Sequence, residues 1–306
     1  MSKEKKIKDN ILIVIAGATA TGKTSIAVKL AKNLRCDVIS ADSRQIYKEM
    51  SIGTAKPSKD EMADVKHHFI DHVSIFDSYN AGIYEKEVIE FLEQYYTNNQ
   101  IAILCGGTGL YIEAVLNGLD KFPDIPDKIQ QKYNNIYKER GLEYLQDELK
   151  RKDKKYFDTV DVYNPHRLIR ALSVIDHTGN KFSDFLKSKS KKRNFRSVNI
   201  RLDLPRDLLY QRINNRVDIM IKRGLEQEAL SLYPFREQKA LQTVGYKELF
   251  EYFDGKISLD EAIELIKRNS RRYAKRQITW FNNRGKWTAF DPGEIREILH
   301  FIDKNM

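Results

Sequence analysis

The stretch that most constrains the fold is an apolar run followed by a loop of small residues and a helical pattern, IVIAGATATGKTSIAVKLA. Its loop, residues 17–24, fits G-x-x-x-x-G-K-[ST] with a strand pattern before it and a helix pattern after it, the context that this motif needs. Backbone N–H groups and the helix start would attract an anion, Lys23 adds a charge, and the Thr24 hydroxyl is placed to ligate Mg²⁺. A glycine turn that only joins a strand to a helix is the alternative. The pattern predicts a phosphate-binding loop made of Gly17, Ala18, Thr19, Ala20, Thr21, Gly22, Lys23 and Thr24.

Short β-branched segments bounded by turn residues predict four buried parallel strands, at residues 11–17, 36–42, 101–107 and 197–204. Helical patterns lie between several of them, including one at residues 82–96. This alternation predicts an α/β fold with a P-loop NTPase-like parallel sheet core. Two further helices are expected after the last strand, at residues 208–233 and 259–283.

The segment 120–192 differs in character, because it contains helix-length periodic stretches and no convincing strand. We therefore expect a helical insertion domain at 120–192. The core would then consist of residues 1–119 and 193–306. The lysine-rich stretch at 187–196 is expected to be a solvated loop that returns to the core, with a phosphate contact as the alternative.

Composition limits the class of protein. The 306 residues include 41% apolar residues, enough for a proper core, and Lys and Arg exceed Asp and Glu by 53 to 43. The resulting formal charge of +10 favours a polyanionic partner such as nucleic acid. No apolar run has the length of a membrane span, and the two cysteines show no disulfide or metal spacing. We expect a cytoplasmic protein that does not contact membranes.

Polar residues follow the second predicted strand. The stretch ISADSRQIYKEMSIGTAKPS places Asp42, Ser43, Arg44 and Gln45 at the carboxyl edge of the sheet, where ligands of such sheets bind. Asp42 is therefore a candidate base close to the anion held by Lys23. A helix N-cap or an outer-sphere Mg²⁺ ligand is the alternative role for Asp42.

The third predicted long strand ends in CGGTGLYIEAVLNGL. Its glycines allow close backbone approach around Thr108. The three strand ends together predict one crevice, which contains the phosphate-binding loop, the carboxylate of Asp42 and the hydroxyl of Thr108.

These segments resemble the tRNA dimethylallyltransferase family, which prenylates adenosine 37 beside the anticodon. The resemblance covers nearly the whole chain, through GATATGKT, ISADSRQIYKEMSIGTAKP, HHFIDHVS, LCGGTGLYIEAVLNGL, NPHRLIRALSV, RINNRVDIMIKRGLEQEA, TVGYKELFEYFDGKIS and AKRQITWFNNR in the family's order. It implies that the P-loop holds the diphosphate of dimethylallyl diphosphate, that N6 of adenosine attacks the allylic carbon, and that diphosphate leaves with the help of Mg²⁺ at Thr24.

The resemblance also implies roles for individual side chains. Asp42 accepts a proton from N6, Thr108 lies where donor and adenine meet, and Arg216 binds the diphosphate, although Arg212 one turn earlier is left open as the diphosphate arginine. The residues implied to contact tRNA are Asp42, Ser43, Arg44, Gln45, Thr108, His166, Arg167, Leu168, Ile169, Arg170, Lys275, Arg276 and Gln277.

The last long helix carries basic residues at a spacing of four, which forms two rows: Lys267, Arg271 and Lys275, then Arg268, Arg272 and Arg276. We expect these rows to hold RNA phosphates, with a solvated basic face as the alternative. The chain departs from the family at Ala18 and Thr21, where Pro and Ser are usual. Both changes leave the backbone cradle possible.

Three other functions share parts of these patterns: a P-loop kinase acting on a small metabolite, an adenylate isopentenyltransferase, and a non-catalytic RNA-binding module. The basic helix and the insertion count against the first two, and the set Asp42, Lys23 and Thr24 counts against the third. A metal site in HHFIDH, through His67, His68, Asp71 and His72, is disfavoured because no further ligand set is evident. A monomer is expected.

Overall fold

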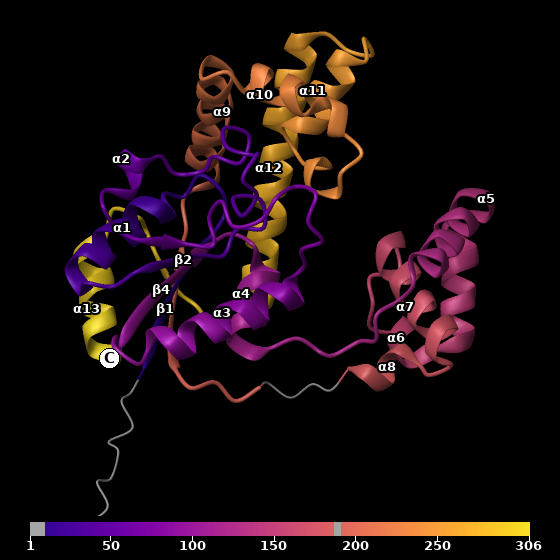
Figure 1. The fold of residues 1–306 in the computed structure, drawn as a ribbon, viewed down its shortest axis with the longest axis horizontal. Helices are drawn as coiled ribbons and strands as arrows, with labels where there is room; N and C mark the ends of the chain where they lie inside the picture. Colours follow the sequence, from indigo (N-terminus) through magenta and orange to yellow (C-terminus); the bar gives the residue numbers. More distant parts are fainter. Residues whose placement is uncertain (1–9, 187–190) are drawn as a thin grey trace, which may run out of the picture. The chain divides into compact units, whose positions relative to one another are not determined.

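The computed structural model describes residues 10–186 and 191–306, in which six parallel strands form one sheet (Figure 1). The strands lie in the order β3 (His67–His68), β2 (Val38–Ser40), β4 (Ile101–Gly106), β1 (Ile11–Gly17), β5 (Arg196–Leu202) and β6 (Thr288–Phe290). The four inner strands are the four that the sequence predicted, so the predicted α/β class is confirmed. The edge strands β3 and β6 escaped prediction because they have only two and three residues, HH and TAF, and no apolar run.

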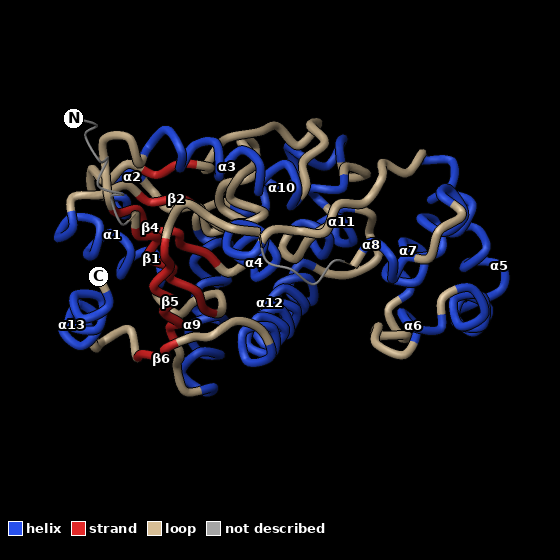
Figure 2. The backbone as a smooth tube through the Cα atoms, turned by 90° about the horizontal axis from the view of Figure 1, so that it is seen from below, coloured by secondary structure: helices blue, strands red, loops and turns tan. Residues whose placement is uncertain are grey.

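Strand β1 explains why the sheet needs a layer of helices on each side. All seven of its residues are buried, and successive side chains point to opposite faces. Leu12 and Val14 pack with α3 (Ala81–Tyr95) and α4 (Gly109–Asn117), whereas Ile13 and Ile15 pack with α1 (Lys23–Leu34) and α13 (Ile295–Asn305). Figure 2 shows the strands between these two layers. The apolar run of β1 is thus buried on both faces, as expected for a central parallel strand.

The helices after β5 are α9 (Arg206–Lys222), α10 (Leu225–Leu232), α11 (Tyr246–Phe253) and α12 (Leu259–Asn283), with 3-10 turns η1 (Tyr233–Phe235) and η2 (Lys239–Leu241) between them. The single helix predicted at 208–233 is wrong. Gly224 takes φ 96° and ends α9 before α10 begins. A left-handed glycine at this point is a common helix terminator, and the continuous apolar pattern concealed it. The short helix α2 (Lys59–Met62) follows β2.

Residues 118–191 form a second compact unit, separate from the unit that contains the sheet. It consists of α5 (Asp127–Lys152), α6 (Lys154–Phe157), α7 (Pro165–Thr178) and α8 (Phe182–Phe185). Leu168 and Leu172 of α7 are buried with Leu145 and Leu149 of α5 in a core of its own. The sequence placed this insertion at 120–192. Residues 187–190 of the expected lysine-rich loop lie outside the described residues.

Among the helices described, none combines the length and apolar character that crossing a bilayer requires.

Candidate active site

The P-loop, residues 17–24, joins β1 to α1. Gly22 immediately precedes α1 with φ 90°, and Ala20 is also left-handed, at φ 66°. The buried Thr21 hydroxyl donates a hydrogen bond to the carbonyl oxygen of Ala18, at 2.9 Å. These local features turn the backbone so that the start of α1 is exposed to the crevice, which is the arrangement that binds phosphate oxygens.

Lys23 is folded onto this loop. Its Nζ donates to the carbonyl oxygen of Ala18 at 2.7 Å. Burial lowers the pKa of Lys23 to about 8, with a smaller lowering from the Arg216 charge, while the charge of Asp42 acts in the opposite direction. A buried ammonium beside a guanidinium is stabilised by an anion, so this pair of cations is suited to a diphosphate.

Arg216 reaches the P-loop from α9. Its Nη1 donates to the Thr19 hydroxyl at 3.2 Å, and burial lowers the pKa of the guanidinium. Arg212, one turn earlier, is exposed. The structure therefore places Arg216 at the anion cradle and leaves Arg212 at the surface.

The β2–α2 loop, residues 41–58, forms the opposite side of the crevice. Asp42 Oδ1 accepts hydrogen bonds from the backbone N–H of Arg44 at 2.8 Å and of Gln45 at 3.3 Å. In the described part of the chain, no hydrogen bond reaches its other carboxylate oxygen. Asp42 caps a turn and not a helix. Its charge partly offsets the lowering of the pKa of both Lys23 and Arg216 by burial, so the three groups lie close enough to interact.

Thr108 lies beside this turn, directly before α4. Its Oγ1 accepts from the backbone N–H of Ser43 at 3.0 Å and donates to the Ser43 hydroxyl at 3.2 Å. Tyr273 of α12 interacts with the Thr108 hydroxyl, and burial raises the pKa of Tyr273 to about 12. The sequence did not single out Tyr273, because its aromatic ring fits the apolar side of α12 equally well.

Gln277 corrects one expectation. The resemblance implied a contact with tRNA, but the side chain is only 6% exposed and is bonded inside the protein at both ends. Its Oε1 accepts from the backbone N–H of Thr19 at 2.8 Å, and its Nε2 donates to the carbonyl oxygen of Gly107 at 2.8 Å. Gln277 thus holds the P-loop against the end of β4. A lone amide among basic residues was the only signal in the sequence.

The residues expected to contact tRNA in the insertion divide into two groups on α7. Leu168 and Ile169 are buried in the core of the insertion, so they pack there and do not face solvent, contrary to expectation. His166, Arg167 and Arg170 are exposed. Of the five residues expected on α7, these three present polar groups that an RNA could reach.

The two basic rows on α12 also differ. Lys267 pairs with Asp218 of α9 at 2.9 Å and with Glu264, and Arg271 donates to Asn214 Oδ1 of α9 at 2.6 Å. These two cations fasten α12 to α9 and are poor candidates for RNA contacts. The exposed cations on α12 are Arg268, Arg272, Lys275 and Arg276.

The histidines of HHFIDH each have their own partner. His67 Nδ1 lies 2.9 Å from the Val65 carbonyl oxygen, His68 Nε2 lies 2.8 Å from Asp37, and His72 Nε2 lies 2.9 Å from Glu87. No cluster of three or more His, Cys, Asp or Glu residues suited to a metal occurs in residues 10–186 and 191–306. Thr24 instead lines a narrow cleft with Ser40 and Gln45, whose oxygens are of the type that Mg²⁺ takes when it is also bound to phosphates.

Comparison with known proteins places this crevice in context. The family described as IPP transferase matches residues 45–284. A tRNA dimethylallyltransferase of Christiangramia forsetii is 48% identical, covering 97% of this chain and 99% of the relative. The tRNA isopentenylpyrophosphate transferase structure from Bacillus halodurans superposes with TM-score 0.72 at 37% identity, covering 97% of this chain and 96% of that one.

A further structure, of a eukaryotic dimethylallyltransferase acting on tRNA, gives TM-score 0.72 at 28% identity over 89% of this chain and 70% of that one. Sequence and fold thus agree over nearly the whole chain. This chain belongs to the IPP transferase family.

Proposed function

We propose that the chain transfers a dimethylallyl group from dimethylallyl diphosphate to N6 of adenosine 37 in tRNA and releases diphosphate. One observation carries this proposal: two cations at the P-loop, Lys23 and Arg216, and the carboxylate of Asp42 lie close enough to interact at the carboxyl edge of the sheet. A donor with an anionic leaving group and an acceptor that loses a proton need this combination of charges.

On the donor side, the P-loop backbone, Lys23 and Arg216 stabilise the charge that develops on the leaving diphosphate as the bond from C1 to oxygen breaks. Because these groups are held in place before the reaction, they need little rearrangement. Thr24 would hold Mg²⁺ beside the same oxygens, and the ion would neutralise part of their negative charge.

On the acceptor side, Asp42 accepts the proton from N6 as the bond from N6 to C1 forms. Hydrogen bonds to one carboxylate oxygen orient the group and leave the other oxygen to meet the amine. The Thr108 hydroxyl is hydrogen-bonded to Ser43, the residue after Asp42. Thr108 would thus lie where the donor and the adenine meet.

Exposed cations of α12, namely Arg268, Arg272, Lys275 and Arg276, supply phosphate contacts for the tRNA. Neutralising Arg272 and Arg276 together should weaken tRNA binding and reduce its salt dependence by about one unit per lost phosphate contact. Neutralising Lys267, which is paired with Asp218, is the matched control and should leave the salt slope unchanged. We further propose a monomer that works in the cytoplasm, where its tRNA substrate is available.

The test is mass spectrometry of tRNA nucleosides after incubation with dimethylallyl diphosphate and Mg²⁺. We expect adenosine to gain the mass of one prenyl group. Prenylation of free adenine nucleotides in place of tRNA would identify an adenylate isopentenyltransferase, and phosphate transfer from a nucleotide would identify a kinase. Either result would overturn the proposal.

A further inference from the structure

Glu228 of α10 accepts four hydrogen bonds, although it lies outside the P-loop crevice. Its Oε2 accepts from the backbone N–H groups of Ser51 at 3.2 Å and Ile52 at 2.8 Å. Its Oε1 accepts from the backbone N–H of Gly53 at 2.9 Å and from the Tyr246 hydroxyl at 2.7 Å. One carboxylate thus captures three consecutive amides of the β2–α2 loop, the loop that begins beside Asp42.

The captured turn is closely packed. A Cβ added at Gly53 would lie 2.7 Å from the ring of Tyr246, so only glycine allows the loop backbone to rest on this ring. Tyr246 is fully buried, and burial together with the Glu228 charge raises its pKa, which keeps its hydroxyl protonated as a donor. Glu228 and Tyr246 therefore form one rigid seat for the turn.

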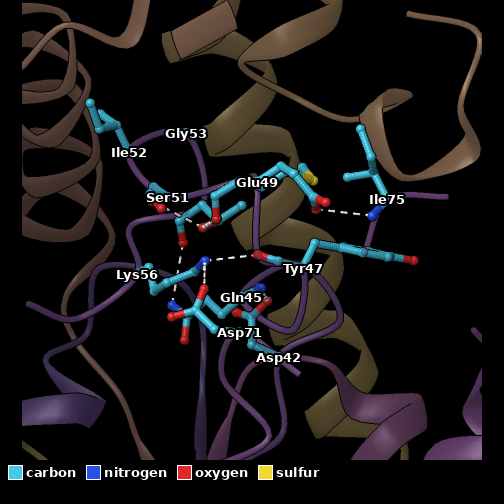
Figure 3. Close-up of polar contacts among 12 residues, drawn as sticks. Asp42, Gln45, Tyr47, Glu49, Ser51, Ile52, Gly53, Lys56, Asp71 and Ile75 are labelled. Carbon is cyan, nitrogen blue, oxygen red and sulfur yellow. Dashed lines mark hydrogen bonds and ion pairs between the residues drawn. The ribbon is translucent and has the colours of Figure 1, made fainter. Parts of the chain in front are cut away.

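Contacts inside the β2–α2 loop connect this seat to Asp42 (Figure 3). Lys56, which follows the turn, donates from Nζ to the carbonyl oxygen of Tyr47 at 2.7 Å and pairs with Asp71. Gln45 donates from Nε2 to the carbonyl oxygen of Ala55 at 3.0 Å, and its own backbone N–H is bonded to Asp42. A shift of residues 51–53 would therefore move the turn that carries the carboxylate.

Glu228 is also linked, through the backbone, to the helix that carries Arg216. Glu228 is on α10, which follows α9 after only Arg223 and Gly224, and α9 carries Arg216 at the P-loop. Glu228 thus joins the loop of the proposed base to the helix that bears the proposed diphosphate arginine.

We infer that Glu228 is a positioning residue that sets the place of Asp42 relative to the P-loop by holding residues 51–53 to α10. The inference rests on the proposed function. A carboxylate suits this task because its two oxygens can accept all four hydrogen bonds, whereas an amide offers one acceptor oxygen and turns an N–H toward the remaining donors.

Glu228→Gln is the main test. Misplacement of a reacting group by about 1 Å costs on the order of 10²-fold in rate, so single-turnover prenylation of tRNA should slow by about that factor. The dissociation constant for dimethylallyl diphosphate should stay within about twofold, because the P-loop itself is untouched. Rates are measured well below the melting temperature of each variant, so that they report folded protein.

Glu248→Gln is the matched control. Glu248, of the neighbouring helix α11, is a buried carboxylate, and it accepts from the backbone N–H of Gly245 at 2.8 Å and from Asn269 Nδ2 at 2.7 Å, but it does not hold the β2–α2 loop. It should lower the melting temperature without slowing the single-turnover step. Gly53→Ala, which pushes the same turn off Tyr246, should reproduce the slow step, and Tyr246→Phe, which removes one bond of four, should slow it less.

The outcomes separate the two proposals. If the wild-type chain prenylates tRNA and Glu228→Gln does so at the wild-type rate with only a lower melting temperature, the role is purely structural and the inference is overturned. If Glu228→Gln does not fold, Gly53→Ala and Tyr246→Phe decide, and wild-type rates in both overturn the inference. A wild-type chain that prenylates no tRNA overturns the proposed function, and this inference with it.

Discussion

The P-loop and the β2–α2 loop face the same crevice but keep their shapes by different means. In the P-loop, the left-handed Ala20 and Gly22 and the bond from Thr21 to Ala18 are all local, and the hydrogen bonds from distant residues meet at Thr19. In the β2–α2 loop, Glu228 holds residues 51–53 from as far as 177 positions along the chain. The P-loop thus takes its turn from local contacts and is held from a distance at Thr19, whereas the β2–α2 loop combines local contacts with one distant carboxylate that holds three consecutive amides.

The largest expected effect tests the acceptor side. Asp42→Asn keeps an oxygen that can cap Arg44 and Gln45 but removes the basicity, so kcat should fall by about 10²- to 10⁴-fold while donor and tRNA affinities change little. Single-turnover prenylation of tRNA measures this. Near-normal turnover would show that Asp42 shapes its loop only and that solvent takes the proton.

The next effect tests the donor side. Lys23→Ala removes the buried cation of the P-loop and should lower kcat/KM for dimethylallyl diphosphate by about 10²- to 10³-fold. The dissociation constant for tRNA should not change, since the β2–α2 loop is intact. Lys29→Ala, an exposed lysine of the same helix, is the control. An unchanged kcat/KM in Lys23→Ala would mean that the loop binds something else.

A smaller effect is expected for Arg216, which reaches the P-loop at Thr19 from α9. Arg216→Ala should weaken diphosphate binding by about 10- to 100-fold, the usual loss for a hydrogen bond to a charged group. Arg212→Ala, on the exposed part of the same helix, should change it by less than about twofold. Equal effects of the two substitutions, measured by calorimetry with diphosphate, would contradict the placement of Arg216.

The smallest effect is a pH dependence located on the donor side alone. Burial lowers the pKa of Lys23 to about 8. In the free protein, a growing fraction of molecules therefore carries an uncharged Lys23 as the pH rises through 8. Bound diphosphate favours the charged form, and binding must then take up a proton. The dissociation constant for dimethylallyl diphosphate should therefore rise about tenfold between pH 7 and pH 9.

Lys23→Arg is the control for this pH dependence, because a guanidinium stays charged across the range. Its donor affinity should be flat between pH 7 and pH 9. If the variant and the wild-type chain show the same slope, the titrating group is not Lys23.

The features that the sequence predicted well are those formed by residues close together in the chain, and the features that it missed depend on distant residues. The loop between β1 and α1 was predicted at its position because its motif lies in one stretch of eight residues, and β1 was predicted because its residues form a short apolar, β-branched run that the structure buries throughout. The helix break at Gly224 and the buried position of Gln277 were missed. Both depend on what lies nearby in the folded chain, which a periodic pattern does not contain.

The sequence by itself determined the parallel α/β core, the loop of small residues between β1 and α1, and the strand ends that carry Asp42 and Thr108. These follow from local rules: apolar runs form buried strands, and small residues after a strand turn toward a helix. The tertiary structure alone decided that Arg216 reaches Thr19, that Lys267 and Arg271 hold α9, that Leu168 and Ile169 are core residues, and that Glu228 supports the β2–α2 loop. Each of these depends on which side of a helix meets a neighbour that is distant in the chain, and helical spacing defines the sides of a helix without saying what each one touches.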